Sequence, residues 1–364
     1  MRTEFIPFHE INSFQKNPFF LDYIQGKNHH FYRHDFSEKT IADIRTNNPL
    51  PEELGHILKD YNENYYSDKT TVQGIQALSK KEAGAVITGQ QPHIDGSPLY
   101  TIYKILTAII TAENLSRKNQ RSYVPVFWNA SDDHDFSEIN NAAFPDALQS
   151  VMRFHLDLPY TGEPIYAYQT GQEFSRLNAG FISGIKQTEY TSLVNEYISL
   201  PVNSPSEQMT CIIKRLFAGT GLVIVEPRLL RNHCKEIYRE IALNDRAINA
   251  EVNETGSKTG NFITRDHSSN LFYLGNSKRE KIRFDNSSVN FQDKTISQQE
   301  FADYVFHHPE QFSPNAAVRP VVQDVLFPTV CYIGGPGDCN YFSQLKPVYA
   351  ILGVRMPVIK PSDS

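Results

Sequence analysis

The sequence has no apolar run that approaches the roughly 20 residues a membrane-spanning helix requires, so no bilayer crossing is expected. Its N-terminus, MRTEFIPFHEINSF, has no long apolar segment of the kind that marks a secretory signal. None of the four cysteines belongs to a CxxC pair, so a zinc ribbon is not indicated. We therefore expect reduced thiols in a cytoplasmic protein.

Several familiar nucleotide-binding and catalytic motifs are also missing. The sequence has no GxxxxGKS/T phosphate loop, no GxGxxG turn after a strand and no GxSxG nucleophile elbow. The net charge of −6 gives no reason to expect a nucleic acid or an anionic membrane as a partner. No internal repeat or low-complexity tract is visible, and the 23 Phe and 19 Tyr residues indicate a folded chain with packed cores.

What the sequence does contain is an alternation of short apolar runs and amphipathic stretches. The predicted strands are residues 85–88, 124–128, 222–225, 329–333 and 354–359. The predicted helices are residues 99–119, 231–243 and 341–352. Continuous apolar strands that alternate with helices indicate a parallel sheet buried on both faces. The sequence thus predicts an α/β fold, a Rossmann-like doubly wound parallel sheet that binds ligands at the carboxyl ends of its strands.

Two stretches interrupt this alternation and are interpreted as inserted connecting segments. One is mixed in character, and the other contains alternating runs at 270–274 and 281–284 that predict antiparallel hairpins. The predicted organisation is a helical lead-in at 1–75, the first half of the core at 76–149, an insertion at 150–205, more core at 206–250, a β-hairpin-rich insertion at 251–312, and the last part of the core at 313–364.

Polar residues follow the first predicted strand, in the segment ITGQQPHIDGSPLY. Its glycines allow close approach of the backbone, and the next helix N-terminus offers unpaired N–H groups to an anion. Ser97 is expected to cap that helix, with Pro98 at the first helical position. The alternative is a tight turn with solvated polar residues. The predicted binding residues are Thr88, Gly89, Gln90, Gln91, Gly96, Tyr100 and Lys104.

The second predicted strand ends in an acidic cluster, WNASDDHDFSEIN. Close like charges raise some carboxylate pKa values, and a neighbouring imidazolium lowers them. Such a cluster suits general acid/base chemistry, and its oxygens could also hold a divalent cation. The alternative is an acidic helix N-terminus capped by Ser131 or Asp132. The predicted catalytic residues are Asp133, His134 and Asp135, and the predicted binding residues are Trp128, Asn129 and Glu138.

The third segment runs from Arg319 through a glycine-rich turn at 334–337. Arg319 and Lys346 could neutralise phosphate or carboxylate groups. The alternatives are a loop that merely permits the turn and a structural ion pair between Arg319 and Asp324. Cys331 is expected to be buried, whereas Cys339 stands near a helix start that could favour a thiolate. The predicted binding residues are Arg319, Asp324, Gly334, Gly335, Gly337, Tyr341, Gln344 and Lys346.

Together these three segments resemble the BshC family of bacillithiol biosynthesis. The matching stretches are VITGQQPHIDGSPLYTIYKILTAI, PVFWNASDDHDFSEINNAAF and FSPNAAVRPVVQDVLFPTVCYIGGPGDCNYFSQLKPVYAILGVRMP. Their order and spacing also fit, and the resemblance covers essentially the whole chain. It implies a core similar to those of nucleotidyltransferases and class I aminoacyl-tRNA synthetases.

The resemblance implies a ligase that forms a carbon–nitrogen amide bond. In the implied reaction, the last step of bacillithiol biosynthesis, L-cysteine acylates the amine of glucosaminyl malate. Because a free carboxylate must be activated first, we hypothesise adenylation of cysteine by ATP; no metal is predicted. The cluster at 133–135 would bind the amine and remove its proton, while Arg319, Gly335 and Lys346 would hold phosphate or the malyl carboxylates.

Some features depart from the family. Members continue for well over a hundred residues as an antiparallel helical coiled coil that looks like a homodimerisation element, and this sequence ends where that tail would begin. Members often have a glycine or apolar residue where Pro92 and His93 stand, and commonly Glu where Asp132 stands. Two other functions stay open. One is a metal-dependent hydrolase or deacetylase that uses the cluster at 133–135, and the other is an inactive substrate-binding fragment.

Overall fold

The computed structural model describes residues 16–46, 48–80, 83–94, 98–146, 148, 150–169, 171–263, 268–285 and 288–362. A five-stranded sheet forms its core, with the strand order β12-β11-β1-β2-β5. Every neighbouring pair in this sheet is parallel. Its strands are β1 (Gly84–Gln90), β2 (Tyr123–Asn129), β5 (Val223–Val225), β11 (Thr329–Gly334) and β12 (Val358–Pro361).

Alternate residues of the central strands enter different hydrophobic cores. In β1, Ala85 and Ile87 belong to one buried cluster, while Val86 belongs to a second cluster together with Val330 of β11. Side chains along a strand point alternately to its two faces, so a strand that is buried on both faces is apolar at successive positions. The continuous apolar runs of the sequence form this sheet for that reason.

The strand order places a switch point between β1 and β11. The chain passes from β1 to β2 and β5 on one side, then crosses to β11 and β12 on the other side of β1. Because the strands are parallel, their carboxyl ends lie along one edge, and ligands of such sheets bind at the switch point. The predicted doubly wound α/β fold is confirmed.

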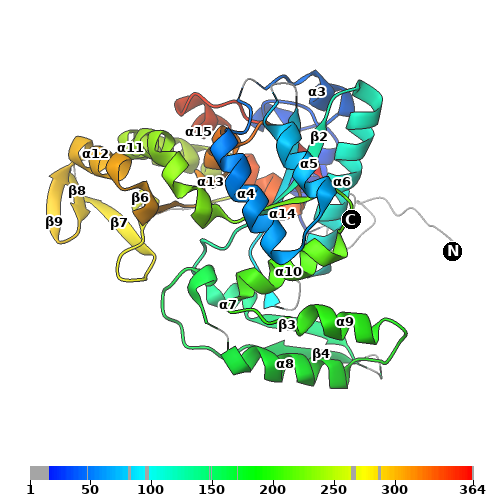
Figure 1. Cartoon of the computed structure of the whole chain (residues 1–364). Coiled ribbons are helices and arrows are strands. Elements are labelled where there is room, and N and C mark those ends of the chain that lie inside the picture. Colours follow the sequence, from blue (N-terminus) through cyan, green and yellow to red (C-terminus); the bar gives the residue numbers. More distant parts are fainter. Residues whose placement is uncertain are drawn as a thin grey trace.

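Helices cover the sheet on both faces (Figure 1). The helices around it are α2 (Pro18–Ile24), α3 (Glu38–Asp43), α4 (Glu52–Tyr65), α5 (Lys69–Leu78), α6 (Leu99–Asn119), α10 (Pro205–Leu216), α11 (Lys235–Thr259), α13 (Arg319–Leu326), α14 (Pro336–Phe342) and α15 (Lys346–Ile351). Short 3-10 helices are η2 (His29–Phe31), η4 (Ile165–Ala167), η5 (Pro227–Cys234) and η6 (Pro309–Gln311). Within the described ranges, none of the helices has the length and apolar character of a bilayer span.

Helix α6 has the predicted bounds but begins differently from the prediction. Pro98 has an extended ψ of 148° and is the N-cap residue, so it is not the first helical residue. The predicted cap, Ser97, lies outside the described residues. The buried positions of α6 recur mostly three or four residues apart and face the sheet. The helix ends where Gln120 adopts a left-handed φ of 50°.

Two other predicted helices have different bounds. The helix predicted at 231–243 is the 3-10 helix η5 up to Cys234, followed by α11, which continues to Thr259 because buried positions recur along its whole length. The helix predicted at 341–352 is divided into α14 and α15. Pro347 stands in the first turn of α15, where its missing N–H cannot continue a helix from α14.

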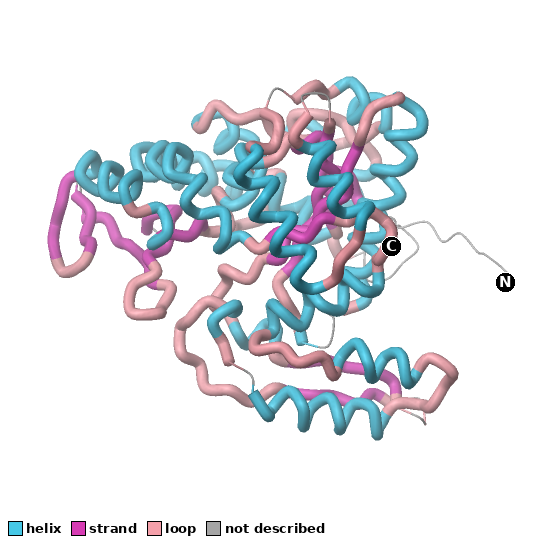
Figure 2. The backbone as a smooth tube through the Cα atoms, viewed as in Figure 1, coloured by secondary structure: helices cyan, strands magenta, loops and turns pink. Residues whose placement is uncertain are grey.

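Two lobes project from the core (Figure 2). One follows α7 (Phe136–Ile139) and contains β3 (Asn141–Pro145), β4 (Val151–His155), α8 (Gly171–Gly184) and α9 (Thr191–Ile198). The other is an antiparallel sheet of order β10-β6-β7-β8-β9. Its elements are β6 (Ser268–Tyr273), β7 (Glu280–Asp285), β8 (Ser288–Phe291), β9 (Lys294–Ser297), α12 (Gln298–His307) and β10 (Phe312–Pro314). The β6–β7 pairing confirms the hairpin predicted from the alternating runs.

Candidate active site

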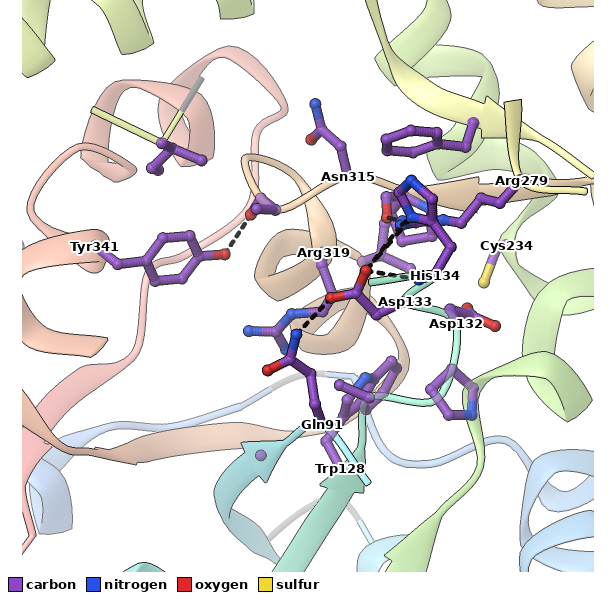
Figure 3. Close-up of a pocket in the computed structure, with 18 of the residues that line it drawn as sticks. Gln91, Trp128, Asp132, Asp133, His134, Cys234, Arg279, Asn315, Arg319 and Tyr341 are labelled. Atoms are coloured by element: carbon purple, nitrogen blue, oxygen red, sulfur yellow. Dashed lines mark hydrogen bonds and ion pairs between the residues drawn. The ribbon is translucent and has the colours of Figure 1, made fainter. Parts of the chain in front are cut away.

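A pocket of about 470 Å³ lies at the carboxyl edge of the parallel sheet, at the switch point between β1 and β11. Its size is typical of small-molecule sites. Turns that follow three separate strands converge on it, as Figure 3 shows for several of the lining residues. The predicted site residues that line the pocket are Gly89, Gln90, Gln91, Trp128, Asp133, His134, Arg319 and Tyr341.

The loop after β2 is anchored from two sides. Ser131 Oγ donates a hydrogen bond to the carboxylate of Glu226 at the end of β5, and Ser206 Oγ donates to the same carboxylate at 2.6 Å. The backbone carbonyl of Asp133 accepts a hydrogen bond from the Ile165 N–H at 2.7 Å. These bonds connect the loop to the core and to η4. The side chains of Asp133 and His134 are therefore presented on a fixed backbone.

Asp133 is surrounded by hydrogen-bond donors. Gln91 Nε2 donates to its Oδ2 at 2.7 Å, and the His134 backbone N–H donates to Oδ1 at 2.7 Å. Arg279 Nη1 lies 3.5 Å from Oδ1. Burial acts to raise the pKa of Asp133, but the bonds from His134 and Gln91 and the charge of Arg279 outweigh it and hold the pKa well below its usual range. Asp133 is thus an anion at neutral pH and a weak base.

Arg279 reaches the acidic loop from the turn before β7. Its Nη1 lies 3.1 Å from His134 Nδ1, its Nε donates to Ser313 Oγ at 3.0 Å, and its Nη2 donates to the Pro314 carbonyl at 2.8 Å. The guanidinium carbon lies 3.9 Å from the centroid of the Phe272 ring. The side chain is only 7% exposed. All three nitrogens of this buried guanidinium are therefore engaged, and its position is fixed.

Lys104 joins two of the converging turns from behind the pocket. Its Nζ donates to the Gly89 carbonyl at 2.8 Å and to Asp338 Oδ2 at 2.8 Å. Asp338 also accepts a hydrogen bond from the Gly335 N–H at 2.9 Å, which caps α14. Lys104 is buried and does not line the pocket, whereas Asp338 does. Lys104 therefore holds the end of β1 against α14, and the carboxylate of Asp338 faces the cavity.

Arg319 and Tyr341 form part of another wall. Arg319 Nη1 donates to Gln323 Oε1 at 3.4 Å, and the Tyr341 hydroxyl donates to the Ala316 carbonyl. Burial opposes the charge of Arg319, but the neighbouring Tyr341, together with Tyr332 and Asp338, keeps its pKa above the usual value. Arg319 thus presents a permanent cation to the pocket. A guanidinium in this position can pair with a carboxylate or a phosphate.

The other predicted site residues do not line the pocket. Asp135 is exposed at the N-cap of α7 and is not one of the residues that line the cavity. Asp324 does not pair with Arg319; it accepts hydrogen bonds from Tyr349 and Gln323. The other predicted site residues that do not line the pocket are Thr88, Tyr100, Lys104, Asn129, Glu138, Gly334, Gly335, Gly337, Gln344 and Lys346. Gly96, which was also predicted, lies outside the described residues.

The four cysteines are free and buried. Burial raises the pKa of the Cys339 thiol well above its usual value, which disfavours the thiolate that its place near a helix start could have favoured. Cys331 is buried in β11, as predicted. Cys234 was not singled out by the sequence, yet it lines the pocket, where burial raises its thiol pKa to about 12.

Several residues of the pocket have no recognisable signal in the sequence. Asp132 pairs with Arg231, and Asp133 pairs with Arg279, across about a hundred residues of chain or more. Arg279 stands in a hairpin turn without any motif around it. Asp338 belongs to the glycine-rich segment, whose charge pattern could have indicated it. Cations that neutralise an acidic loop from distant elements are visible only in the folded chain.

No group of three or more His, Cys, Asp or Glu side chains that could hold a metal ion occurs within the described part of the chain. Asp132 and Asp133 are each paired with an arginine. The His93 ring, which the hydrolase alternative would recruit, contacts the Gln91 carbonyl through Nδ1 at 3.1 Å. The described residues that the hydrolase alternative would use therefore do not form a set of metal ligands.

Comparison with known proteins agrees with this geometry. A family model described as "Bacillithiol biosynthesis BshC, N-terminal Rossmann-like domain" matches residues 1–362. Several relatives are named "Putative cysteine ligase BshC". The protein from Chloroherpeton thalassium is 31% identical, and the match covers 100% of this chain and 70% of that protein. The protein from Salinibacter ruber is also 31% identical, and the match covers 90% of this chain and 62% of that protein. The Staphylococcus haemolyticus relative is 28% identical, and the match covers 87% of this chain and 62% of the relative.

The chain thus spans about 62% of the length of several of these relatives. The family model nevertheless covers the core sheet, both insertions and the pocket. The Rossmann-like sheet order and the site at its switch point agree with the description of that model. The chain therefore belongs to the family of BshC N-terminal Rossmann-like domains of bacillithiol biosynthesis.

Proposed function

We propose that this chain carries the active site of a ligase that joins L-cysteine to the amine of glucosaminyl malate through an amide bond. Its relatives carry the name "Putative cysteine ligase BshC". The observation that carries the proposal is the convergence of the turns after β1, β2 and β11 on one pocket. In that pocket an ionised Asp133 and a cationic Arg319 are both available to a substrate of mixed charge.

The two charges suit the two ends of the substrates. Asp133 is held as an anion by Gln91 and Arg279, so it can bind the ammonium group of the sugar. The protons that this nitrogen loses as the amide bond forms would pass to solvent water. Arg319 can bind a carboxylate or a phosphate in bidentate fashion. Trp128 and Tyr332 line the pocket and give a sugar ring an aromatic surface.

ATP would supply the activation that the cysteine carboxylate needs before it can form an amide. The N-terminus of α14 is already occupied by the Asp338 carboxylate, which accepts the Gly335 N–H and pairs with Lys104. Arg319 lines this wall of the pocket and is a cation that phosphate oxygens could pair with. The residues present therefore fit a phosphate group at Arg319.

The experiment is incubation of the purified chain with glucosaminyl malate, cysteine and ATP, followed by mass spectrometry of the products. Bacillithiol is expected only when all three are present. Asp133→Asn is expected to lower kcat/KM roughly tenfold to a hundredfold, because a charged hydrogen-bonding partner of the amine is lost. Asp285→Asn, on the exposed end of β7, is the matched control and should leave the rate unchanged.

Two results would contradict the proposal. Bacillithiol formed without a nucleoside triphosphate would remove ATP as the activating group. A complete absence of product, with folded protein and with ATP present, would remove the ligase activity from this chain. Substrate binding without turnover would support the substrate-binding fragment instead.

A further inference from the structure

His134 Nδ1 faces the guanidinium of Arg279 at 3.1 Å. Arginine has only N–H donors and keeps its proton in proteins, so it cannot accept a hydrogen bond. If Nδ1 also carried a proton, two N–H groups would point at one another across this distance. The contact is favourable only when Nδ1 is the acceptor and Arg279 is the donor (Figure 3).

A neutral imidazole carries one proton, and an acceptor at Nδ1 places that proton on Nε2. The His134 ring lines the pocket, and its side chain is 26% exposed. Within the described part of the chain, no protein group is hydrogen-bonded to Nε2. His134 therefore presents an N–H donor, without a free lone pair, to whatever occupies the pocket.

We infer that Arg279 is a positioning residue that holds His134 in the Nε2–H tautomer, so that His134 donates a hydrogen bond to a substrate oxygen and does not remove the proton of the amine. The oxygen would belong to the cysteine carboxylate as it is activated or to the amide-forming carbonyl, where negative charge develops. The tautomer stands on geometry alone, whereas the identity of the oxygen rests on the proposed ligase function.

The second lobe delivers Arg279 in a fixed position. The Arg279 N–H donates to the Gly162 carbonyl of the first lobe at 2.9 Å, and Ser313 and Pro314 hold the guanidinium from β10. His134 also lies beside the Phe272 ring, with 5.5 Å between the centroids. The ring of His134 thus cannot turn to offer Nδ1 to the pocket without losing the contact with Arg279.

The groups that face His134 decide what happens when Arg279 is removed. Asp133 Oδ1 lies 3.5 Å from Nδ1, farther than Arg279 Nη1 at 3.1 Å. A proton on Nδ1 could donate to this carboxylate, so Asp133 favours the opposite tautomer and competes with Arg279 for that atom. In Arg279→Met the cation is absent, so Nδ1 is free to take a proton and donate it to Asp133. The variant should therefore show an Nδ1–H tautomer, which the wild-type chain should not show.

The test is a long-range proton–nitrogen correlation spectrum of the whole chain labelled at histidine, with the signals of His134 identified by their loss in His134→Gln. The wild-type spectrum is expected to show an unprotonated Nδ1 and a protonated Nε2 for the neutral ring of His134. Arg283→Met, which removes an exposed arginine of β7, the strand that follows the turn with Arg279, should leave this pattern unchanged.

A protonated Nδ1 in the wild-type spectrum would overturn the inference. This measurement uses the wild-type chain, so it does not depend on whether any variant folds. An Arg279→Met spectrum with the wild-type tautomer would overturn the positioning role of Arg279. A near-ultraviolet circular dichroism spectrum of each variant confirms that its aromatic packing is intact before its tautomer is read.

Turnover separates a donor from a base. A glutamine amide can place an N–H near the position of Nε2, whereas an asparagine amide reaches only the region of Nδ1, and neither is a base. His134→Gln is therefore expected to keep roughly tenfold more of kcat than His134→Asn. Equal and complete loss in both variants would favour the base role. A wild-type chain without turnover would remove the ligase function and the donor role with it, while the spectrum still decides the tautomer.

Discussion

Asp245 is a carboxylic acid buried in α11, outside the pocket lining. It accepts hydrogen bonds from Ser269 Oγ at 2.6 Å and from the Asn270 N–H at 2.6 Å. Burial raises its pKa to about 7, although these bonds act in the opposite direction. The folded chain therefore keeps a proton on Asp245 that the unfolded chain releases near pH 4.

The sign of the resulting pH dependence follows directly. Between about pH 4 and pH 7 the folded state binds more protons than the unfolded state, so the contribution of Asp245 to the free energy of unfolding falls as the pH rises. Asp245→Asn removes this titration. As the pH rises across that window, the free energy of unfolding of the wild type is expected to fall relative to that of Asp245→Asn by on the order of a few kcal/mol. Urea unfolding at several pH values measures the difference, and parallel pH profiles would contradict the prediction.

At the scale of residues, the sequence indicates which groups carry charge but not which groups pair. Asp133 and His134 were predicted from a local cluster, and both line the pocket. Arg279, which sets the electrostatics of both, is 146 residues from Asp133. Asp135, which stands beside His134 in the sequence, is exposed at the N-cap of α7. Adjacent residues of a loop point in different directions, and only tertiary packing decides which of them enters the cavity.

At the scale of elements, Lys104 connects α6 with the end of β1 and with α14. Its side chain is 2% exposed, while that of Asp338 is 26% exposed. Lys104→Met removes the cationic partner of Asp338 and the donor to the Gly89 carbonyl, and it is expected to lower the free energy of unfolding by about 3 kcal/mol. Asp338→Asn is expected to cost less, because water reaches that side chain and partly replaces the pairing.

The double variant decides whether the two residues act as a pair. Lys104→Met combined with Asp338→Asn removes both charges, so it should be more stable than the sum of the two single effects implies. Urea unfolding of the four proteins gives this coupling energy. Strict additivity would show that the contact does not stabilise the fold.

Elements differ in how well their patterns specify them. The strands of the parallel sheet were predictable because burial on both faces requires continuous apolar residues, as in Val124 to Trp128 of β2. Helix ends were less predictable, because they depend on single residues. Pro347 divides the predicted last helix, and the extended ψ of Pro98 makes it the N-cap of α6 and not its first helical residue. These local effects do not change the apolar periodicity from which the helices were predicted.

At the scale of the whole molecule, the two lobes complete the site that the sheet begins. The turn that carries Arg279 bonds to Gly162 of the first lobe, and η4 bonds to the backbone of the acidic loop. The sequence indicated two interruptions of the core but gave no sign that both meet over the same pocket. Contacts between the two lobes form between residues that are far apart in the chain, and no local sequence pattern predicts them.

The two parts of the molecule should differ in local stability. Strands β1 and β2 have hydrogen-bonded neighbours on both sides, whereas β3 and β4 pair only with each other among the described strands. The residues of β4 alternate between exposed and half-buried, while those of β2 are all buried. A two-stranded ribbon is only marginally stable without further packing. The first lobe should therefore open locally far more often than the core.

Hydrogen exchange measured by mass spectrometry tests this difference. Amide hydrogens of β3 and β4, in 141–145 and 151–155, are expected to exchange at least roughly tenfold faster than those in 84–90 and 123–129. The Ile165 N–H of η4, which bonds to the Asp133 carbonyl at 2.7 Å, should exchange more slowly than the amides of β4, because its acceptor lies in the anchored loop after β2. Equal protection of β4 and β2 would mean that the lobe and the core unfold as one unit. In that case the geometry of His134 and Arg279 would depend on the stability of the whole lobe and not on η4 alone.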